Sequence, residues 1–417
     1  MGLPRFTFNR RQHLILGSHI KTVVKSALAA GALVVLVAVT GFYSFVLIKP
    51  NAYPIPAANV TAVLPPGVSY KQLTTGTWDD FWPAWSPNGS LIAYVSYRTG
   101  EPALWIMSAS GTGALQASAG SEAIGYPSWN PNSTMVAYWS MNGQDSEIDI
   151  YNVENNSTYV VPGSGPLAVQ SAPAWSPDGS YLAFFVRSTE SQLLVLDLGT
   201  GRTTAVANVS GSYLAASWAT GDSLLYSSST EGYEQIMRLT LSTDEESQLF
   251  NETANSISPT VGLSGQLAYY SDLNPGQDSD YLQGYGGFDV WVSNTDGTNA
   301  TFQYSLVHET EGSGQIVEVP YIPGVIDTSV QPAWSYDGTM IVYRALLEGM
   351  GSSLYLWNVG SATTTEIGPM GPGVDSFEPS WSPSGASIAF CSDLGGLYHI
   401  WVTNTNGSAA STGNGGY

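Results

Sequence analysis

The sequence predicts an all-β protein, a seven-bladed β-propeller of four-stranded antiparallel blades preceded by one N-terminal transmembrane helix. A tryptophan-centred unit recurs about every 45 residues, apolar runs alternate with turn residues, and charged residues make up only 11% of the 417 residues. The expected organisation is a basic segment at 1–25, a transmembrane helix at 26–48, a proline-rich linker at 49–68, the propeller at 69–410 and a flexible tail at 411–417.

The repeated unit is clearest in residues 83–95, which read PAWSPNGSLIAYV. Proline presets φ and glycine accepts a positive φ, so Ser-Pro-Asn-Gly predicts a tight turn between two strands. The equivalent central positions are Trp85, Trp129, Trp175, Trp218, Val261, Trp334 and Trp381, separated by 44, 46, 43, 43, 73 and 47 residues. Seven copies with one large insertion in the fifth therefore predict seven blades.

Two stretches carry a family resemblance: residues 175–180 (WSPDGS) and 400–407 (IWVTNTNG) resemble the repeats of TolB-like propellers. The resemblance covers residues 70–410 and implies a propeller of Tol-type, WD40-like repeats. Copies four and five each lack one turn residue, and copy five has Val261 in place of tryptophan. Typical TolB-like proteins have six blades and an additional N-terminal domain. Their role in a Tol complex is therefore not transferred to this chain.

The two ends of the propeller are expected to meet in one blade. The last copy ends after its third strand, which leaves that blade without an outer strand. Residues 69–74 (SYKQLT) precede the first tryptophan unit and read as a fourth strand. We therefore expect this segment to complete the last blade.

Residues 26–48 contain no charge and are rich in Ala, Val and Leu. As a helix this segment extends about 34 Å, enough to cross the hydrocarbon layer. A cleaved signal peptide is the alternative, but no small-residue cleavage site follows Ile48. Five basic residues precede the span and one ends it, which predicts a cytoplasmic N-terminus. The expected protein is a single-pass cell-membrane protein with an extracellular or periplasmic propeller.

Charge excludes a nucleic-acid partner. After residue 50 the chain carries 33 acidic residues against six basic ones, whereas phosphate binding needs clustered Lys and Arg. Four histidines, two of them before the apolar segment, argue against a multi-histidine metal site. The single cysteine, Cys391, lies in an apolar strand pattern and is expected to be a buried small hydrophobe. No cofactor is expected, apart from a candidate calcium ion.

The insertion of the fifth copy falls in two loops, 271–287 and 308–328, both on the face that carries the inter-blade loops. Asp272, Asp278 and Asp280 form a candidate calcium site there, and a solvated acidic loop is the alternative.

Other aromatic and acidic residues lie immediately before innermost strands, where they could rim the central channel on the same face. Aromatics beside carboxylates suit peptide or sugar recognition, whereas ordinary packing between blades is the alternative. The candidate binding residues are Asp79, Asp80, Phe81, Trp82, Tyr126, Asp375, Phe377 and Glu378.

Nine Asn-x-Ser/Thr sequons occur, whereas chance predicts roughly four in a chain of this composition. They begin at Asn59, Asn88, Asn132, Asn155, Asn156, Asn208, Asn251, Asn299 and Asn406. Six of them map to the hairpin-turn face. We hypothesise that glycans shield this face and leave the opposite one free.

The preferred function is a membrane-anchored binding or scaffolding module that engages protein or glycan at the cell surface. One alternative is a structural subunit that assembles into a surface layer, filament or membrane complex through its helix. A second is a carboxylate-dependent glycoside hydrolase, since acid pairs need not be adjacent in sequence. We do not expect the protein to be an enzyme, because its sequence has no Gly-x-Ser-x-Gly elbow with a partner histidine.

Overall fold

The computed structural model describes residues 33–39, 42–48, 65, 67–143, 145–165, 168–169, 171–187, 190–211, 214–250, 253–273, 288–302, 324–326, 331–347, 351–361, 363–369 and 373–405. The chain divides into two compact units, Met1–Val60 and Thr61–Tyr417. Over the described residues the structure is all-β and contains no helix. This confirms the predicted fold class at the level of a propeller-like all-β protein.

In the first unit the transmembrane helix predicted over residues 26–48 is not confirmed. Strand β1 (Leu33–Val39) instead pairs antiparallel with β2 (Phe42–Ile48), from Leu33 opposite Ile48 to Val39 opposite Phe42. Valine dominates β1 and aromatic residues are frequent in β2, and such residues favour an extended backbone when a second strand can pair. Residues 26–32 lie outside the described residues. Nothing in the described ranges is a helix long and apolar enough to cross a membrane.

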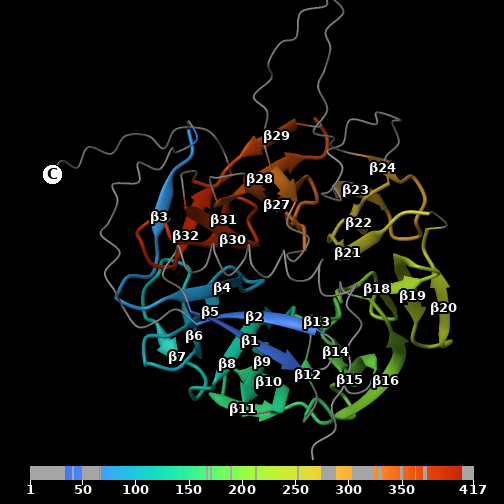
Figure 1. Ribbon diagram of the computed structural model, residues 1–417, viewed down its shortest axis with the longest axis horizontal. Helices are drawn as coiled ribbons and strands as arrows, with labels where there is room; N and C mark the ends of the chain where they lie inside the picture. Colours follow the sequence, from blue (N-terminus) through green and yellow to red (C-terminus); the bar gives the residue numbers. More distant parts are fainter. Residues whose placement is uncertain are drawn as a thin grey trace, which may run out of the picture. The chain divides into compact units, whose positions relative to one another are not determined.

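In the second unit the sheets follow one another in sequence order (Figure 1). The first sheet has β4 (Asp80–Trp85), β5 (Leu91–Ser96), β6 (Ala103–Ser108) and β7 (Leu115–Gln116). The second has β8 (Ala123–Trp129), β9 (Met135–Asn142), β10 (Asp145–Asn152) and β11 (Ser157–Val160). The third has β12 (Ala168–Val169), β13 (Ala174–Trp175), β14 (Tyr181–Arg187), β15 (Ser191–Asp197) and β16 (Arg202–Val209).

The remaining sheets continue this order. The fourth has β17 (Ala216–Trp218), β18 (Ser223–Thr230), β19 (Tyr233–Thr240) and β20 (Glu245–Gln248). The fifth has β21 (Ser256–Val261), β22 (Gln266–Ser271), β23 (Asp289–Asn294) and β24 (Thr301–Phe302). A nine-stranded sheet combines β25 (Gly324–Ile326), β26 (Ala333–Trp334), β27 (Met340–Leu347), β28 (Gly351–Asn358), β29 (Thr363–Glu366), β30 (Val374–Trp381), β31 (Ser387–Ser392), β32 (His399–Asn404) and β3 (Tyr70–Gln72).

The turn between the first two strands of a repeat is closed by side chains, as the sequence predicts. In the first sheet Ser86 Oγ accepts the N–H of Leu91, and its hydroxyl donates to Asn88 Oδ1 at 2.9 Å. Asn88 Oδ1 also accepts the N–H of Ser90 at 3.0 Å, and Gly89 takes a φ of 76°. A short polar side chain and a glycine together satisfy the backbone of the turn.

In five copies the repeated tryptophan bonds to the preceding copy, whereas Trp85 donates to the carbonyl of Gly89 in its own turn. The indole N–H of Trp129 donates to the carbonyl of Ala84, the residue just before Trp85, at 2.9 Å. The same bond runs from Trp175 to Ser128, from Trp218 to Ala174, from Trp334 to Thr260 and from Trp381 to Ala333. At the fifth copy Val261 has no indole, and its backbone N–H donates to Ser217 Oγ at 2.9 Å instead. The repeat therefore uses tryptophan as a hydrogen-bonding staple as well as an apolar side chain.

The apolar core lies between neighbouring sheets. Leu104 of the first sheet and Tyr138 of the second are buried in one cluster, and Ile92 of the first sheet shares another with Ile400 of the last. Each sheet therefore buries both faces against its neighbours, which is how propeller blades are stabilised.

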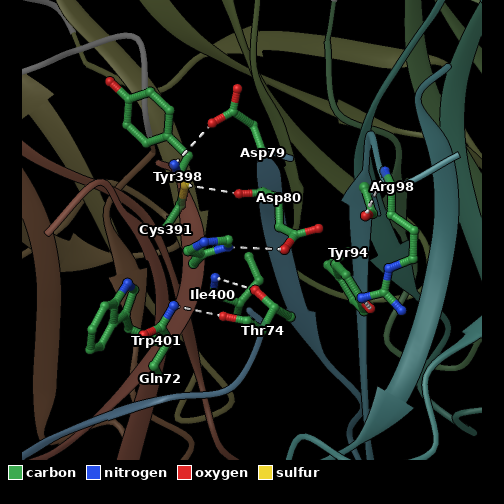
Figure 2. Close-up of polar contacts among 12 residues, drawn as sticks. Gln72, Thr74, Asp79, Asp80, Tyr94, Arg98, Cys391, Tyr398, Ile400 and Trp401 are labelled. Atoms are coloured by element: carbon green, nitrogen blue, oxygen red, sulfur yellow. Dashed lines mark hydrogen bonds and ion pairs between the residues drawn. The ribbon is translucent and has the colours of Figure 1, made fainter. Parts of the chain in front are cut away.

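The structure confirms that the two ends of the propeller meet. Strand β3 pairs antiparallel with β32, with Tyr70 opposite Thr403 and Gln72 opposite Trp401. Thr74 Oγ1 then accepts the N–H of Ile400 at 2.9 Å (Figure 2). Strand β3 thus supplies the outer strand that the last repeat lacks.

The sheets of the sixth and seventh copies are joined, which the sequence did not predict. Two residues of β28, Gly351 and Ser352, pair in parallel with Val374 and Asp375 of β30. Gly351 has a φ of 95°, and a Cβ atom there would lie 2.1 Å from the carbonyl oxygen of Val374. Only glycine fits this close approach of two backbones.

Candidate binding face

The innermost strands of four repeats begin with the same backbone irregularity. The residue just before the proline of the repeat takes a positive φ at Trp82 (51°), Tyr126 (54°), Ser258 (54°) and Glu378 (56°). At each of these positions the pairing register shifts as in a β-bulge. Proline has no N–H for the ladder, and a bulge leaves residues unpaired and turns their side chains in a new direction. Left-handed backbone is uncommon for residues of this size, and such strain gathers at functional sites.

Six aromatic residues gather at these strand starts and at two nearby loops. Phe81 lies at the centre, with ring centroids 5.2 Å from Tyr398, 5.7 Å from Trp82, 6.0 Å from Tyr97 and 6.3 Å from Phe377. The ring of Tyr126 lies 5.4 Å from that of Trp82 at an angle of 51°. We call this set, Phe81, Trp82, Tyr97, Tyr126, Phe377 and Tyr398, the aromatic cluster. Tyr97 and Tyr126 stay 38% and 43% exposed, so the cluster reaches the surface.

Carboxylates surround the aromatic cluster and brace its backbone. Asp79 Oδ1 accepts the N–H of Tyr398 at 3.0 Å, a contact drawn in Figure 2. Asp393 Oδ1 accepts the N–H of Asp375 at 2.8 Å. Burial and then the negative charges of Asp393 and Asp375 raise the pKa of Tyr398 above its usual value. The potential around this ring is therefore negative.

One cation lies among these groups. The guanidinium of Arg344 stacks 5.1 Å from the ring centre of Phe377 and lies 4.0 Å from Asp375 Oδ1. It also donates to Ser352 Oγ at 3.0 Å. Its charge is thus directed toward β28 and the start of β30.

Glu378 links the first and last repeats at this face. Its Oε2 accepts the backbone N–H of Trp82 at 2.7 Å. Desolvation raises the pKa of Glu378 to about 8, while the hydrogen bond from Trp82 and the charge of Arg344 act in the opposite direction. Glu378 also raises the pKa of Tyr126, after burial, which places its charge near that exposed ring. Near neutral pH this carboxyl can hold or release a proton according to what lies beside it.

The sequence predicted that Asp80 could rim the channel, but the structure buries it. It is 0% exposed, its Oδ2 lies 3.3 Å from His399 Nδ1, and its carbonyl accepts the thiol of Cys391 at 3.3 Å (Figure 2). Asp80 is the first residue of β4, whereas Asp79 precedes the strand and accepts the N–H of Tyr398. Asp80 therefore belongs to the junction between β4 and β32. Cys391 is buried, as predicted.

The structure brings the other seven candidate residues together, from segments 296 residues apart in the case of Trp82 and Glu378. Sequence reasoning missed Tyr97, Tyr398, Arg344 and Asp393. Tyr97 and Asp393 directly follow second strands, and Tyr398 directly precedes a third strand. These loops share the face of the inter-blade loops, and that strand order was the available signal.

The candidate calcium site has one described member. Both carboxylate oxygens of Asp272 accept hydrogen bonds from Asn255, from its backbone N–H and from its side-chain amide, each at 2.6 Å. Asp278 and Asp280 lie outside the described residues. Across the ranges that the structure describes, no group of three His, Cys, Asp or Glu could hold a metal ion.

The described sequon asparagines are all exposed: Asn88, Asn132, Asn155, Asn156, Asn208 and Asn299. Asn88 and Asn132 lie in turns between first and second strands, and the pair at 155–156 lies between β10 and β11. Asn299 lies between β23 and β24, and Asn208 lies within β16. Asn59, Asn251 and Asn406 lie outside the described residues.

Similarity to known proteins agrees with this fold. Residues 114–279 match the family described as the TolB beta propeller domain. A curated relative, the Protein TolB homolog of Chlorobium luteolum, is 31% identical over 147 residues, which cover 33% of this chain. The match spans 31% of that relative, so about a third of its length is represented here.

Solved structures share the architecture at low identity. The oligogalacturonate lyase of Vibrio parahaemolyticus gives a TM-score of 0.60 at 10% identity, covering 84% of this chain and 100% of that chain. The β-propeller domain of the Trilobed protease from Pyrococcus furiosus gives 0.55 at 12% identity, covering 79% of this chain and 96% of that chain. At such identities the likeness concerns the fold alone. Together with the recurrent Trp-Ser-Pro-Asp/Asn-Gly turns, the sequence matches show that residues 114–279 are similar to the TolB β-propeller domain.

Proposed function

We propose that this chain is a protein-binding propeller of the cell envelope and that it binds its partner through the face that carries the aromatic cluster. The observation that supports this most directly is the association of Phe81, Trp82 and Tyr126 with Glu378 on strained strand starts. Aromatic side chains are enriched where proteins bind one another, and loops on a rigid scaffold are the usual place for recognition. The relationship to a TolB homolog is consistent with a protein partner.

Affinity capture from native membranes tests this proposal. The intact protein is compared with Tyr126→Ala, which removes an exposed ring of the cluster. Tyr159→Ala is the matched control, because Tyr159 is similarly exposed (42% against 43%) but lies on the outer strand β11. We expect the partner to be lost with the first variant and kept with the second. Equal capture by both variants would contradict the proposal.

The architecture that we propose around this face has seven blades, the nine-stranded sheet counting as two. The six described sheets of the second unit and the β3–β32 closure support this count, because the nine-stranded sheet contains two tryptophan repeats. We also propose that residues 26–48 anchor the propeller to the cell membrane with its loops outside, on the strength of their uncharged apolar composition and flanking charges. Extraction of native membranes with alkaline carbonate distinguishes an anchored chain, which stays in the pellet, from a released one.

Glycosylation of the turn face is a further part of this proposal. The exposed sequons at Asn88, Asn132 and Asn299 lie at turns away from the strand starts that carry the cluster. Glycans there would leave the aromatic cluster open to a partner. Peptide mass spectrometry of native material that found these three asparagines unmodified would overturn this part.

We place binding ahead of glycoside hydrolysis because the described carboxylates of the cluster already have structural partners. Asp79 and Asp393 accept backbone N–H groups, and Asp375 lies near Arg344. Binding of a glycan and assembly as a structural subunit remain the competing proposals. Loss of capture after glycosidase treatment of the partner would favour glycan recognition. Capture that depends on residues 1–50 and is unaffected by Tyr126→Ala would favour assembly.

A further inference from the structure

We propose that the binding face accepts one basic side chain of its partner, an arginine or lysine in an extended segment, against the rings of Trp82 and Tyr126 with the carboxylate of Glu378 as its counter-ion. This inference rests on the proposed protein-binding function and deepens it by naming the chemistry that the partner presents.

The two rings form the apolar part of the site. Their centroids lie 5.4 Å apart and their planes meet at 51°, so they make a tilted corner rather than a parallel stack. Tyr126 remains 43% exposed. A cation within about 6 Å of an aromatic face is attracted by the ring quadrupole, and arginine and lysine stems also pack on apolar surface. A corner of two aromatic rings thus favours a long cationic side chain.

The charge of the site comes from Glu378. Its Oε2 is held 2.7 Å from the backbone nitrogen of Trp82, which fixes the carboxylate beside one of the two rings. Its charge also acts on Tyr126, the second ring. The carboxylate is therefore bonded to the backbone of Trp82 and close enough to Tyr126 for its charge to act on that ring.

The surroundings leave the site short of positive charge. Arg344 is the cation that the described contacts place here; it contacts Phe377, Ser352 and Asp375, and its charge also acts on Glu378. Asp79 and Asp393 add further negative charge within the cluster. On a larger scale the chain after residue 50 has 33 acidic residues against six basic ones. Long-range attraction therefore favours a basic partner as well.

Binding of a cation at Glu378 must be coupled to release of its proton. Burial raises the pKa of this carboxyl to about 8, so below pH 8 it is mostly protonated and a cation has to displace the proton. The groups that face it from other elements are Arg344 on β27, Cys391 on β31 and Tyr126 on β8. The pKa values of Cys391 and Tyr126 are raised, so both keep their protons when Glu378 loses its own.

Calorimetric titration of the full chain tests this proposal. The probe is the acetylated, amidated peptide Ser-Gly-Arg-Gly-Ser, compared with the same peptide carrying citrulline, the neutral isostere of arginine. We expect a clear preference for the arginine peptide and a rise in its affinity of about 30-fold from pH 6.5 to pH 9. At pH 6.5, titrations in buffers of different ionisation enthalpy should show release of about one proton.

Glu378→Gln is the diagnostic variant, because it keeps the size of the side chain and removes its charge. It should abolish the pH dependence, the proton release and the preference over citrulline. Glu231→Gln is the matched control: Glu231 has the same backbone conformation (φ 53° against 56°) and is exposed in the turn between β18 and β19. The control should bind the arginine peptide as the native chain does.

The basic-side-chain proposal and the proposed protein-binding function can be contradicted independently. Equal binding of the arginine and citrulline peptides, or a pH dependence that survives Glu378→Gln, overturns the basic-side-chain proposal. If Tyr126→Ala still abolishes capture of the native partner in that case, the face binds protein through other chemistry. If capture is also unaffected by Tyr126→Ala, the proposed function itself fails.

Discussion

The backbone N–H of Trp82 donates a 2.7 Å hydrogen bond to Oε2 of Glu378, which lies 296 residues further along the chain. Both residues have left-handed backbone, and each immediately precedes the proline of its repeat. One bond therefore joins the first repeat to the last at the centre of the candidate binding face.

Glu378 should make the stability of the protein depend on pH. Its pKa is raised to about 8 in the folded chain from the usual 4.5, so the native state holds a proton that the unfolded state releases. Stability from this group is therefore present at low pH and is lost as pH rises from about 4.5 to 8. In urea unfolding, the free energy of unfolding of Glu378→Gln minus that of the native chain should be larger at pH 9 than at pH 5. A stability difference that is the same at both pH values would contradict this assignment.

Gly351→Ala should destabilise the protein by about 3 kcal/mol or more, because a Cβ atom there collides with a backbone carbonyl at positive φ. The atom would lie 2.1 Å from the oxygen of Val374. Gly373→Ala is the matched control, since Gly373 also has a positive φ (76°) but no atom within 4 Å of an added Cβ. The control should lose only about 1–2 kcal/mol in denaturant unfolding. Equal losses would show that β28 and β30 can separate without penalty.

The hydrogen bond of the repeated tryptophan should contribute measurably to the free energy of unfolding at Trp129. Trp129→Phe removes the donor to the carbonyl of Ala84 and leaves that acceptor without its indole partner. Trp357→Phe changes another buried ring, whose indole nitrogen has no hydrogen-bond partner among the described residues. The first substitution should reduce the free energy of unfolding by about 1 kcal/mol more than the second. If the second loses as much, the tryptophan of the repeat acts through its volume alone.

Closure of the propeller should depend on Thr74. Thr74→Val keeps the shape of the side chain but leaves the buried N–H of Ile400 without its acceptor, which costs about 1–3 kcal/mol. Hydrogen exchange followed by mass spectrometry should show faster exchange in β32 and β3, with β14 and β15 of the third sheet unchanged. Uniformly faster exchange in all sheets would mean that closure and global unfolding are a single step.

The sequence by itself determined the repeated unit, its turns and strands, and the segment that completes the last repeat. The Ser-Pro-Asp/Asn-Gly turns, the apolar strands and the spacing of the central tryptophans depend on local backbone preferences, which act between neighbours in sequence. The same reasoning placed residues 69–74 beside the last repeat, because an unfinished sheet leaves its edge unpaired. The sequence also named seven residues that the structure brings together at the candidate binding face, since strand order fixes which loops share a face.

Only the tertiary structure decided the contacts between repeats. The burial of Asp80 depended on the register of β4, because a shift of one residue exchanges surface for core. The bond from Trp82 to Glu378 and the position of Arg344 over Phe377 join segments that no local rule relates. The raised pKa of Glu378 likewise comes from desolvation, which exists only once the repeats have packed together. Local propensities thus specify the blades, whereas the chemistry of the binding face arises from packing between distant parts of the chain.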